Sequence, residues 1–156
     1  MTDTEFIIEP GRQDIVITHV FDAPRNVVFK AMTDPELIPK WWGPRDVSTI
    51  VDQLDARPGG QWRFVHREED GSEYGFHGVF HDFVPGQRVV QTSEFEGVPG
   101  EVALETMTFD EAGGGTKVVA KSLYSSVETR DAVVQTGMES GARESYKRLD
   151  ELVKAQ

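Results

Sequence analysis

The sequence predicts an α+β fold in which a strongly curved antiparallel sheet wraps around one long C-terminal helix. Six strand-like segments follow one another between residues 47 and 124 with only short turns between them, as in an antiparallel meander. An amphipathic segment from about 128 to 154 then predicts the helix. The chain has 156 residues, the length of one domain, so we assign residues 1–156 to a single unit.

The N-terminal part predicts a hairpin followed by two short helices. Pro10 and Gly11 occupy the central positions of a type II turn, and the β-branched segment 14–21 predicts a strand. Pro24 suits the first turn of a helix, where its missing N–H costs nothing. A second helix is expected to begin at Asp34-Pro35, and Pro39 limits it to one or two turns.

The meander begins near residue 47, and glycine and proline mark its turns. Arg57-Pro58-Gly59-Gly60 and Gly113-Gly114-Gly115 are examples, because both residue types are typical of tight turns. The strands are expected at 47–55, 60–67, 73–83, 87–96, 101–110 and 116–124. Segments joined so closely pair antiparallel. No linker, repeat or low-complexity segment suggests a second domain.

The C-terminal segment has the apolar periodicity of a helix. Its stripe consists of Val134, Met138, Gly141, Ser145, Leu149 and Leu152. Two glycines, Gly137 and Gly141, lie on or beside this stripe, where each costs up to about 1 kcal/mol relative to alanine. We therefore expect a sheet or a ligand to approach the helix closely at these positions.

Composition excludes several classes of function. A net charge of −11 argues against nucleic acid, which needs a basic stripe, and against an anionic membrane. The sequence has no cysteine, no apolar run that spans a bilayer and an acidic start unlike a secretory signal, so we expect a cytoplasmic protein. We expect no cofactor and no metal site, since no His-based metal motif is present. A protein partner stays open, and the chain is expected to be a monomer or a homodimer.

The chain also resembles a known superfamily. The resemblance rests on the order and spacing of Phe21-Asp22-Ala23-Pro24, Thr33-Asp34-Pro35-Glu36, Trp41-Trp42-Gly43-Pro44, Arg57-Pro58-Gly59-Gly60 and the tail from Gly137 to Leu149. Together these are similar to the START-like (SRPBCC) superfamily and, within it, to the branch named after the activator of the heat-shock protein 90 ATPase. This resemblance implies a helix-grip fold with a pocket between sheet and helix. It supplies no catalytic motif.

Strand alternation predicts which side chains face that pocket. On 60–67 the inner residues are Trp62, Phe64 and His66, opposite the polar Gln61 and Arg63. The remaining expected cavity residues are Phe76, Phe80, Glu105, Met107, Tyr124, Met138 and Gly141. The large aromatic side chains among them either line a cavity or simply fill the core. Trp41 and Trp42 are expected to pack the short helices over the sheet at the cavity mouth.

Glu105 is the strongest candidate for a chemically active residue. On 101–110 we take the Phe109 face as the inner one, because it carries more apolar bulk, and this choice puts Glu105 inside. A buried carboxylate needs partners or takes up a proton, and His66 and Tyr124 are the natural candidates. The alternative is that Glu105 lies at the sheet edge or on the outer face and is solvated.

Three functions are compatible with these patterns. The leading hypothesis is binding of a small apolar or amphipathic molecule in the cavity. The second is a cavity enzyme, a cyclase or hydrolase, with Glu105 and His66 as acid and base. The third is a chaperone-interacting domain similar to the heat-shock ATPase activator. We rank it last, because the chain lacks the additional N-terminal domain of full-length eukaryotic activators.

Overall fold

The computed structural model describes residues 4–43 and 46–155, so the first three residues of the acidic start and Pro44 of the tryptophan motif lie outside it. Its strands form one antiparallel sheet in the order β1-β2-β8-β7-β6-β5-β4-β3. The strands are β1 (Glu5–Ile7), β2 (Asp14–Phe21), β3 (Ser48–Leu54), β4 (Gln61–Arg67), β5 (Glu73–Val84), β6 (Arg88–Phe95), β7 (Val102–Ala112) and β8 (Gly115–Leu123). The helices are α1 (Arg25–Thr33), the 3-10 turn η1 (Ile38–Lys40), α2 (Val127–Gln135) and α3 (Met138–Lys154).

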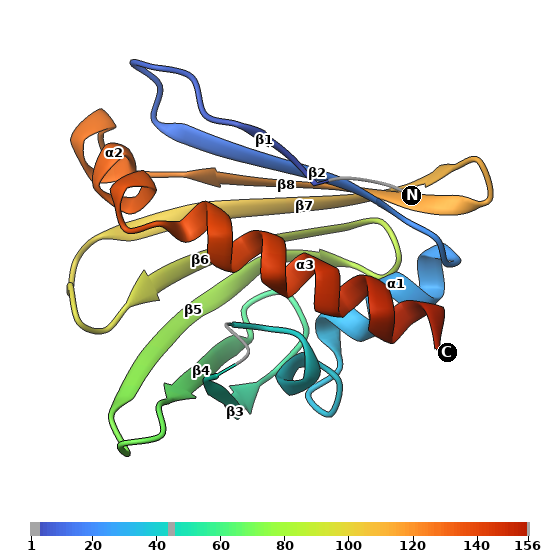
Figure 1. The fold of residues 1–156 in the computed structure, drawn as a ribbon, viewed down its shortest axis with the longest axis horizontal. Coiled ribbons are helices and arrows are strands. Elements are labelled where there is room, and N and C mark those ends of the chain that lie inside the picture. The colour runs from blue at the N-terminus through green and yellow to red at the C-terminus, as the bar shows by residue number, and fades with distance from the viewer. Residues whose placement is uncertain (1–3, 44–45, 156) are drawn as a thin grey trace.

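The meander and the helix-grip arrangement are confirmed. Strands β3 to β7 each pair with the next one in sequence, and β2 joins the sheet by pairing along its whole length with β8. Figure 1 shows α3 lying across one face of the curved sheet, with α1 near one end of α3 and α2 near the other. The second short helix is only the 3-10 turn η1, and the expected start at Asp34-Pro35 is wrong: the helix begins at Ile38. Pro39 lies inside it and cannot donate the backbone hydrogen bond that a longer α-helix needs.

The predicted single helix at 128–154 is wrong in one respect, because it is two helices separated at Thr136 and Gly137. Gly137 has a φ of +83°, a left-handed conformation that glycine adopts without strain, and it precedes the first residue of α3. At Gly141 an added methyl group would meet no atom within 4 Å, so no close approach explains this glycine. The same holds at Gly137, so the expectation that the sheet approaches the helix closely is wrong at both glycines.

A buried polar contact ties α3 to the sheet. The Nε2 atom of His19 on β2 lies 2.7 Å from Oδ2 of Asp150 on α3, and its Nδ1 lies 2.9 Å from Oγ1 of Thr4. Only 3% of the His19 surface is exposed, and its ring contacts those of Phe21 and Tyr146. The contact spans most of the chain, so it holds the last helix against the second strand.

Two polar side chains fix helix α2 beside the start of β2. Ser126 caps it by accepting a hydrogen bond from the Thr129 N–H at 3.0 Å. Arg130, 2% exposed, donates to the backbone carbonyl of Asp14 at 3.2 Å, which joins α2 to the start of β2. Its guanidinium also contacts Asp131 in the same helix.

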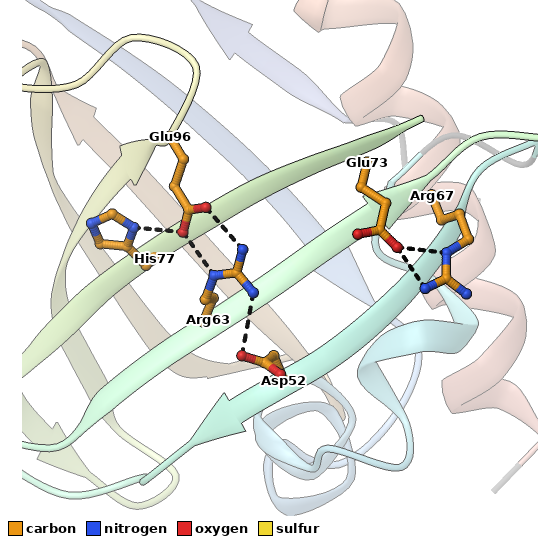
Figure 2. Close-up of polar contacts among 6 residues, drawn as sticks. All are labelled: Asp52, Arg63, Arg67, Glu73, His77 and Glu96. Atoms are coloured by element: carbon orange, nitrogen blue, oxygen red, sulfur yellow. Dashed lines mark hydrogen bonds and ion pairs between the residues drawn. The ribbon is translucent and has the colours of Figure 1, made fainter. Parts of the chain in front are cut away.

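Charged side chains cover the outer face of the sheet at β3–β6. Arg63 donates two hydrogen bonds to Glu96, at 2.8 and 2.9 Å, and a third to Asp52 at 3.3 Å (Figure 2). His77 contacts the same Glu96 carboxylate at 2.8 Å. A methyl group at Gly75 would lie 2.2 Å from that carboxylate, so the ion pair crosses β5 at a residue that has no side chain to obstruct it. The Arg63 pair, and His77 after it, lower the pKa of Glu96 to about 2.

The exposure of alternate side chains along β7 shows that Glu105 lies on the inner face of the sheet. Phe109 is 1% exposed, whereas Leu104 on the opposite face is 42% exposed. Glu105 pairs in register with Ser122 and Met107 with Ala120, so all four residues lie on the inner face. In the described part of the chain no helix is long and apolar enough to cross a membrane.

Candidate functional site

A cavity of about 250 Å³ lies on the inner face of the sheet, bounded by α3 and by the segment that follows η1. Its walls are largely aromatic and aliphatic. The aromatic members are Trp41, Trp42, Trp62, Phe64, Phe80 and Tyr146. Every tryptophan of the chain is among them. The predicted aromatic set therefore does not fill the core completely, because part of it surrounds open space.

Hydrogen bonds to the backbone fix two of these indoles. The Nε1–H of Trp41 donates to the carbonyl of Ala31 in α1 at 2.8 Å, and that of Trp62 donates to the carbonyl of Thr92 in β6 at 3.2 Å. Buried indoles normally find such partners. With the polar edges satisfied, both rings present apolar faces to the cavity.

A row of polar side chains crosses the cavity floor. Gln91 on β6, Glu105 on β7 and Ser122 on β8 are direct cross-strand neighbours in register. The Nε2–H of Gln91 donates to Oε1 of Glu105 at 3.2 Å, and the Ser122 hydroxyl donates to Oε2 at 3.3 Å. All three residues line the cavity. The carboxyl group thus receives one long hydrogen bond on each oxygen.

The surroundings of Glu105 favour its uncharged form. Burial raises its pKa above the ordinary 4.5, and the hydrogen bonds from Ser122 and Gln91 oppose this only in part. Burial, reinforced by the nearby Glu105 charge, also raises the pKa of Tyr124 to about 12 and that of Tyr146 in the same direction. Both tyrosines therefore stay protonated around neutrality, so Glu105 is the group of this cluster that titrates first.

His66 is not the partner of Glu105. His66 faces Tyr74 on β5, whereas the Glu105 row meets β5 at Phe80, six residues further on, which is about 20 Å along a strand. The His66 ring packs instead against Trp42 and Phe76, with centroids 4.5 and 5.0 Å away. Burial lowers its pKa, and its Nε2 atom has no hydrogen-bond partner among the described residues.

The other predicted site residues divide into two groups. Those that line the cavity are Trp62, Phe64, Phe80, Glu105 and Met107, together with Trp41 and Trp42. Those outside its lining are His66, Phe76, Tyr124, Met138 and Gly141. Phe76 packs between Trp42 and Phe95, Tyr124 follows the last residue of β8, and Met138 is the first residue of α3. All five therefore lie beyond the extent of the cavity.

Several residues that line the cavity were not predicted from the sequence patterns. Gln91 follows two valines on β6, so alternation assigns no inner face to that strand; its register opposite Glu105 is the signal that identifies it. Ala142 and Tyr146 of α3 also line the cavity, beside Ser145 of the expected stripe, because residues three and four apart share one face of a helix. Among the residues that the structure describes, no three His, Asp or Glu side chains gather in a way that suits a metal ion.

An antiparallel sheet that grips a C-terminal helix around an internal cavity defines a START-like (SRPBCC) domain. The chain belongs to the family of Activator of Hsp90 ATPase homolog 1-like proteins, whose sequence profile matches residues 22–154. The resemblance seen in the sequence motifs is thereby confirmed. A comparison with curated proteins finds no match.

Solved structures of bacterial proteins show the same fold. Protein Ms6760 from Mycobacterium smegmatis is 25% identical, with a TM-score of 0.87, and the match covers 99% of each chain. A protein from Rhodobacter sphaeroides is 26% identical, with a TM-score of 0.86 over 97% of this chain and 99% of that one. Protein CV1439 from Chromobacterium violaceum is 27% identical, with a TM-score of 0.81 over 90% and 96%.

Proposed function

We propose that this protein binds a small, largely apolar ligand in the cavity between the sheet and α3. The observation that carries the proposal is the cavity itself, about 250 Å³ of open space surrounded by indole and phenyl rings. Protein interiors are normally close-packed, so open space of this size needs a reason. Preformed, mostly apolar cavities with a few polar groups are the usual form of small-molecule sites. We place this binding in the cytoplasm, the compartment expected from the composition.

The dimensions of the cavity limit the ligand. An apolar cavity of about 150 Å³ is sufficient to hold benzene. The volume of the present cavity, about 250 Å³, is larger than this. The expected ligand is therefore a single aromatic ring with a two- or three-atom substituent. The polar row of the cavity, Gln91, Glu105 and Ser122, lies on the sheet side, whereas the Ser145 hydroxyl on the α3 side donates to the Gly43 carbonyl. This arrangement favours a ligand with one polar end.

The cavity-enzyme hypothesis loses its proposed residues. Glu105 bonds to Gln91 and Ser122, and His66 lies against Trp42, so the acid–base pair does not form among the described residues.

The chaperone hypothesis receives its only support from the family description, and no contact in the described structure favours it over ligand binding. Binding is therefore the function that the geometry supports best.

Intrinsic fluorescence provides a direct test, because all three tryptophans line the cavity. We expect neutral one-ring compounds such as ethylbenzene and 2-phenylethanol to change the emission of the wild-type protein saturably. In Ala142→Phe, a phenyl ring added from α3 should occupy the cavity and abolish the change. Ala132→Phe places the same ring on the exposed surface of α2 and should bind like the wild type.

Native mass spectrometry of the purified protein complements this titration. A bound molecule that is present in the wild type and in Ala132→Phe but lost from Ala142→Phe would identify the natural ligand. The proposal fails if neither probe binds the wild type saturably. It also fails if Ala142→Phe, shown to be folded by circular dichroism, binds the probes as the wild type does.

A further inference from the structure

Glu105 is a carboxyl group whose hydrogen bonding is incomplete. Two neutral groups, Gln91 and Ser122, donate to it at 3.2 and 3.3 Å, near the upper limit for a hydrogen bond. An ionised carboxylate has about four acceptor sites. No lysine, arginine or histidine of the described chain forms an ion pair with it. The site therefore has unused capacity for a donor, and the cavity is the side from which a donor can arrive.

Charged and titratable neighbours of Glu105 do not fill this role. Tyr146 faces it from α3 and Tyr124 from the end of β8, and both influence it as uncharged phenols. Lys121, the cation next to Ser122 on β8, directs its Nζ atom toward Asp14, 3.8 Å away. Gln91 and Ser122 carry no charge. Lys121 also belongs to the cavity lining, but its ammonium group is paired with Asp14, so Glu105 is the anionic group among the described lining residues and has no ion pair with a protein cation.

The rest of the cavity has the chemistry that suits an organic cation. Trp41, Trp42, Trp62 and Tyr146 belong to its walls. The faces of such rings attract ammonium groups, and the interaction strengthens when the cation is removed from water. The net charge of −11 adds a long-range attraction for cations and repels anions. A carboxylate among aromatic rings is complementary to an amine with an apolar body.

We propose, building on the function proposed above, that the ligand is a small lipophilic primary amine whose ammonium group binds Glu105 while its apolar body lies among the tryptophans. The ammonium supplies the donors that Glu105 lacks. Gln91 and Ser122 hold the carboxylate in place from either side. This assignment names the class of ligand. It distinguishes the amine from neutral compounds of the same shape, which occupy the cavity but provide no cation to pair with Glu105.

Binding of this kind releases a proton. Burial raises the pKa of Glu105 in the free protein, which extends its protonated form to higher pH, and a primary amine in water is an ammonium ion. When the ion pair forms, the carboxyl proton goes to the solvent, so protonated Glu105 and R–NH₃⁺ become the pair COO⁻ and R–NH₃⁺ plus one H⁺. Amine affinity should therefore rise with pH until either Glu105 in the free protein or the amine in solution has lost its proton.

The test compares 2-phenylethylamine with 2-phenylethanol, which differ only in the polar group. We expect the amine to bind wild-type protein at least about tenfold more tightly at pH 8, with a preference that decreases at pH 6. Calorimetry in two buffers with different heats of ionisation should show proton release with the amine and none with the alcohol. In Glu105→Gln the two probes should bind equally, at the affinity of the alcohol.

Glu111→Gln is the matched control, because it removes an exposed carboxylate from the same strand and should keep the amine preference. If 2-phenylethanol binds and the amine binds no more tightly, the amine assignment is wrong while the proposed function stands. A preference that survives in Glu105→Gln overturns the role of Glu105. If neither compound binds, the proposed function fails and this inference fails with it.

Discussion

The indole of Trp62 lies over Gly78, its cross-strand neighbour in the β4–β5 pair, and reaches past it to donate to the Thr92 carbonyl on β6. A methyl group at Gly78 would lie 2.6 Å from Trp62 Nε1 and 1.8 Å from the Thr92 oxygen. The glycine therefore permits one cavity wall to bond across three strands. The cavity depends on a residue that contributes no side chain to it.

We expect Gly78→Ala to destabilise the protein by about 3 kcal/mol, because the methyl group displaces the indole and breaks its buried hydrogen bond. Urea unfolding followed by circular dichroism measures this change. Gly141→Ala is the control: it lies in α3 with open space around it and should stabilise by up to about 1 kcal/mol. Equal effects of the two substitutions would contradict the role given to Gly78.

The contact between His19 and Asp150 provides a second prediction. Asp150→Asn weakens the 2.7 Å bond that joins α3 to β2, and we expect a loss of about 1–2 kcal/mol in the free energy of unfolding. Glu151→Gln, the exposed neighbour on the same helix, should change it by less than about 0.5 kcal/mol. Chemical denaturation at pH 7 separates the two. Similar losses in both variants would show that the loss of a negative charge, and not the contact with His19, determines the change in stability.

The ion pairs on the outer face predict a response to acid. The pKa of Glu96 is lowered to about 2 in the folded protein from an ordinary 4.5, so its stabilising contribution is complete above about 4.5 and is lost as the pH falls toward 2. Glu96→Gln should cost about 1 kcal/mol at pH 7, and this difference should shrink between pH 4.5 and 2. Thermal unfolding at several pH values measures it. A difference that is constant with pH would be contrary to this expectation.

Glu105 predicts the opposite pH dependence. Because burial raises its pKa, the folded protein keeps a proton that the unfolded chain loses above about 4.5, and stability decreases as the pH rises through the folded-state pKa. Glu105→Gln carries no such charge and should be more stable than the wild type by about 1 kcal/mol at pH 8, with a smaller advantage at pH 4. Unfolding in urea at both pH values tests this. A wild type that is the more stable protein at pH 8 would contradict it.

Much of the fold follows from local chemistry. The strand segments were predicted to within one or two residues at most ends, because glycine and proline mark the turns and β-branched residues fill β2. The break at Gly137 was missed. Its flanking segments both have helical periodicity, and a left-handed glycine between them leaves no trace in the apolar pattern.

The candidate site was predicted less completely, because the sequence does not give the register between neighbouring strands. Alternation assigns residues to faces but not to neighbours, so it places Glu105 inward without showing that Gln91 and Ser122 lie beside it. The expected pairing with His66 failed because residues on one face of a large sheet can lie many residues apart. Where the cavity ends, between Phe64 and Phe76, depends on how Trp42 packs, and no pattern in the sequence encodes that.

The row formed by Gln91, Glu105 and Ser122 has a consequence for the evolution of specificity. Each position belongs to a different strand, and none of the three side chains takes part in the backbone ladder that holds the sheet together. Single nucleotide changes can therefore rewrite the chemical preference of the pocket one position at a time, with no insertion and no altered strand pairing. The architecture itself tolerates extensive sequence change, because proteins only about 25% identical keep this fold.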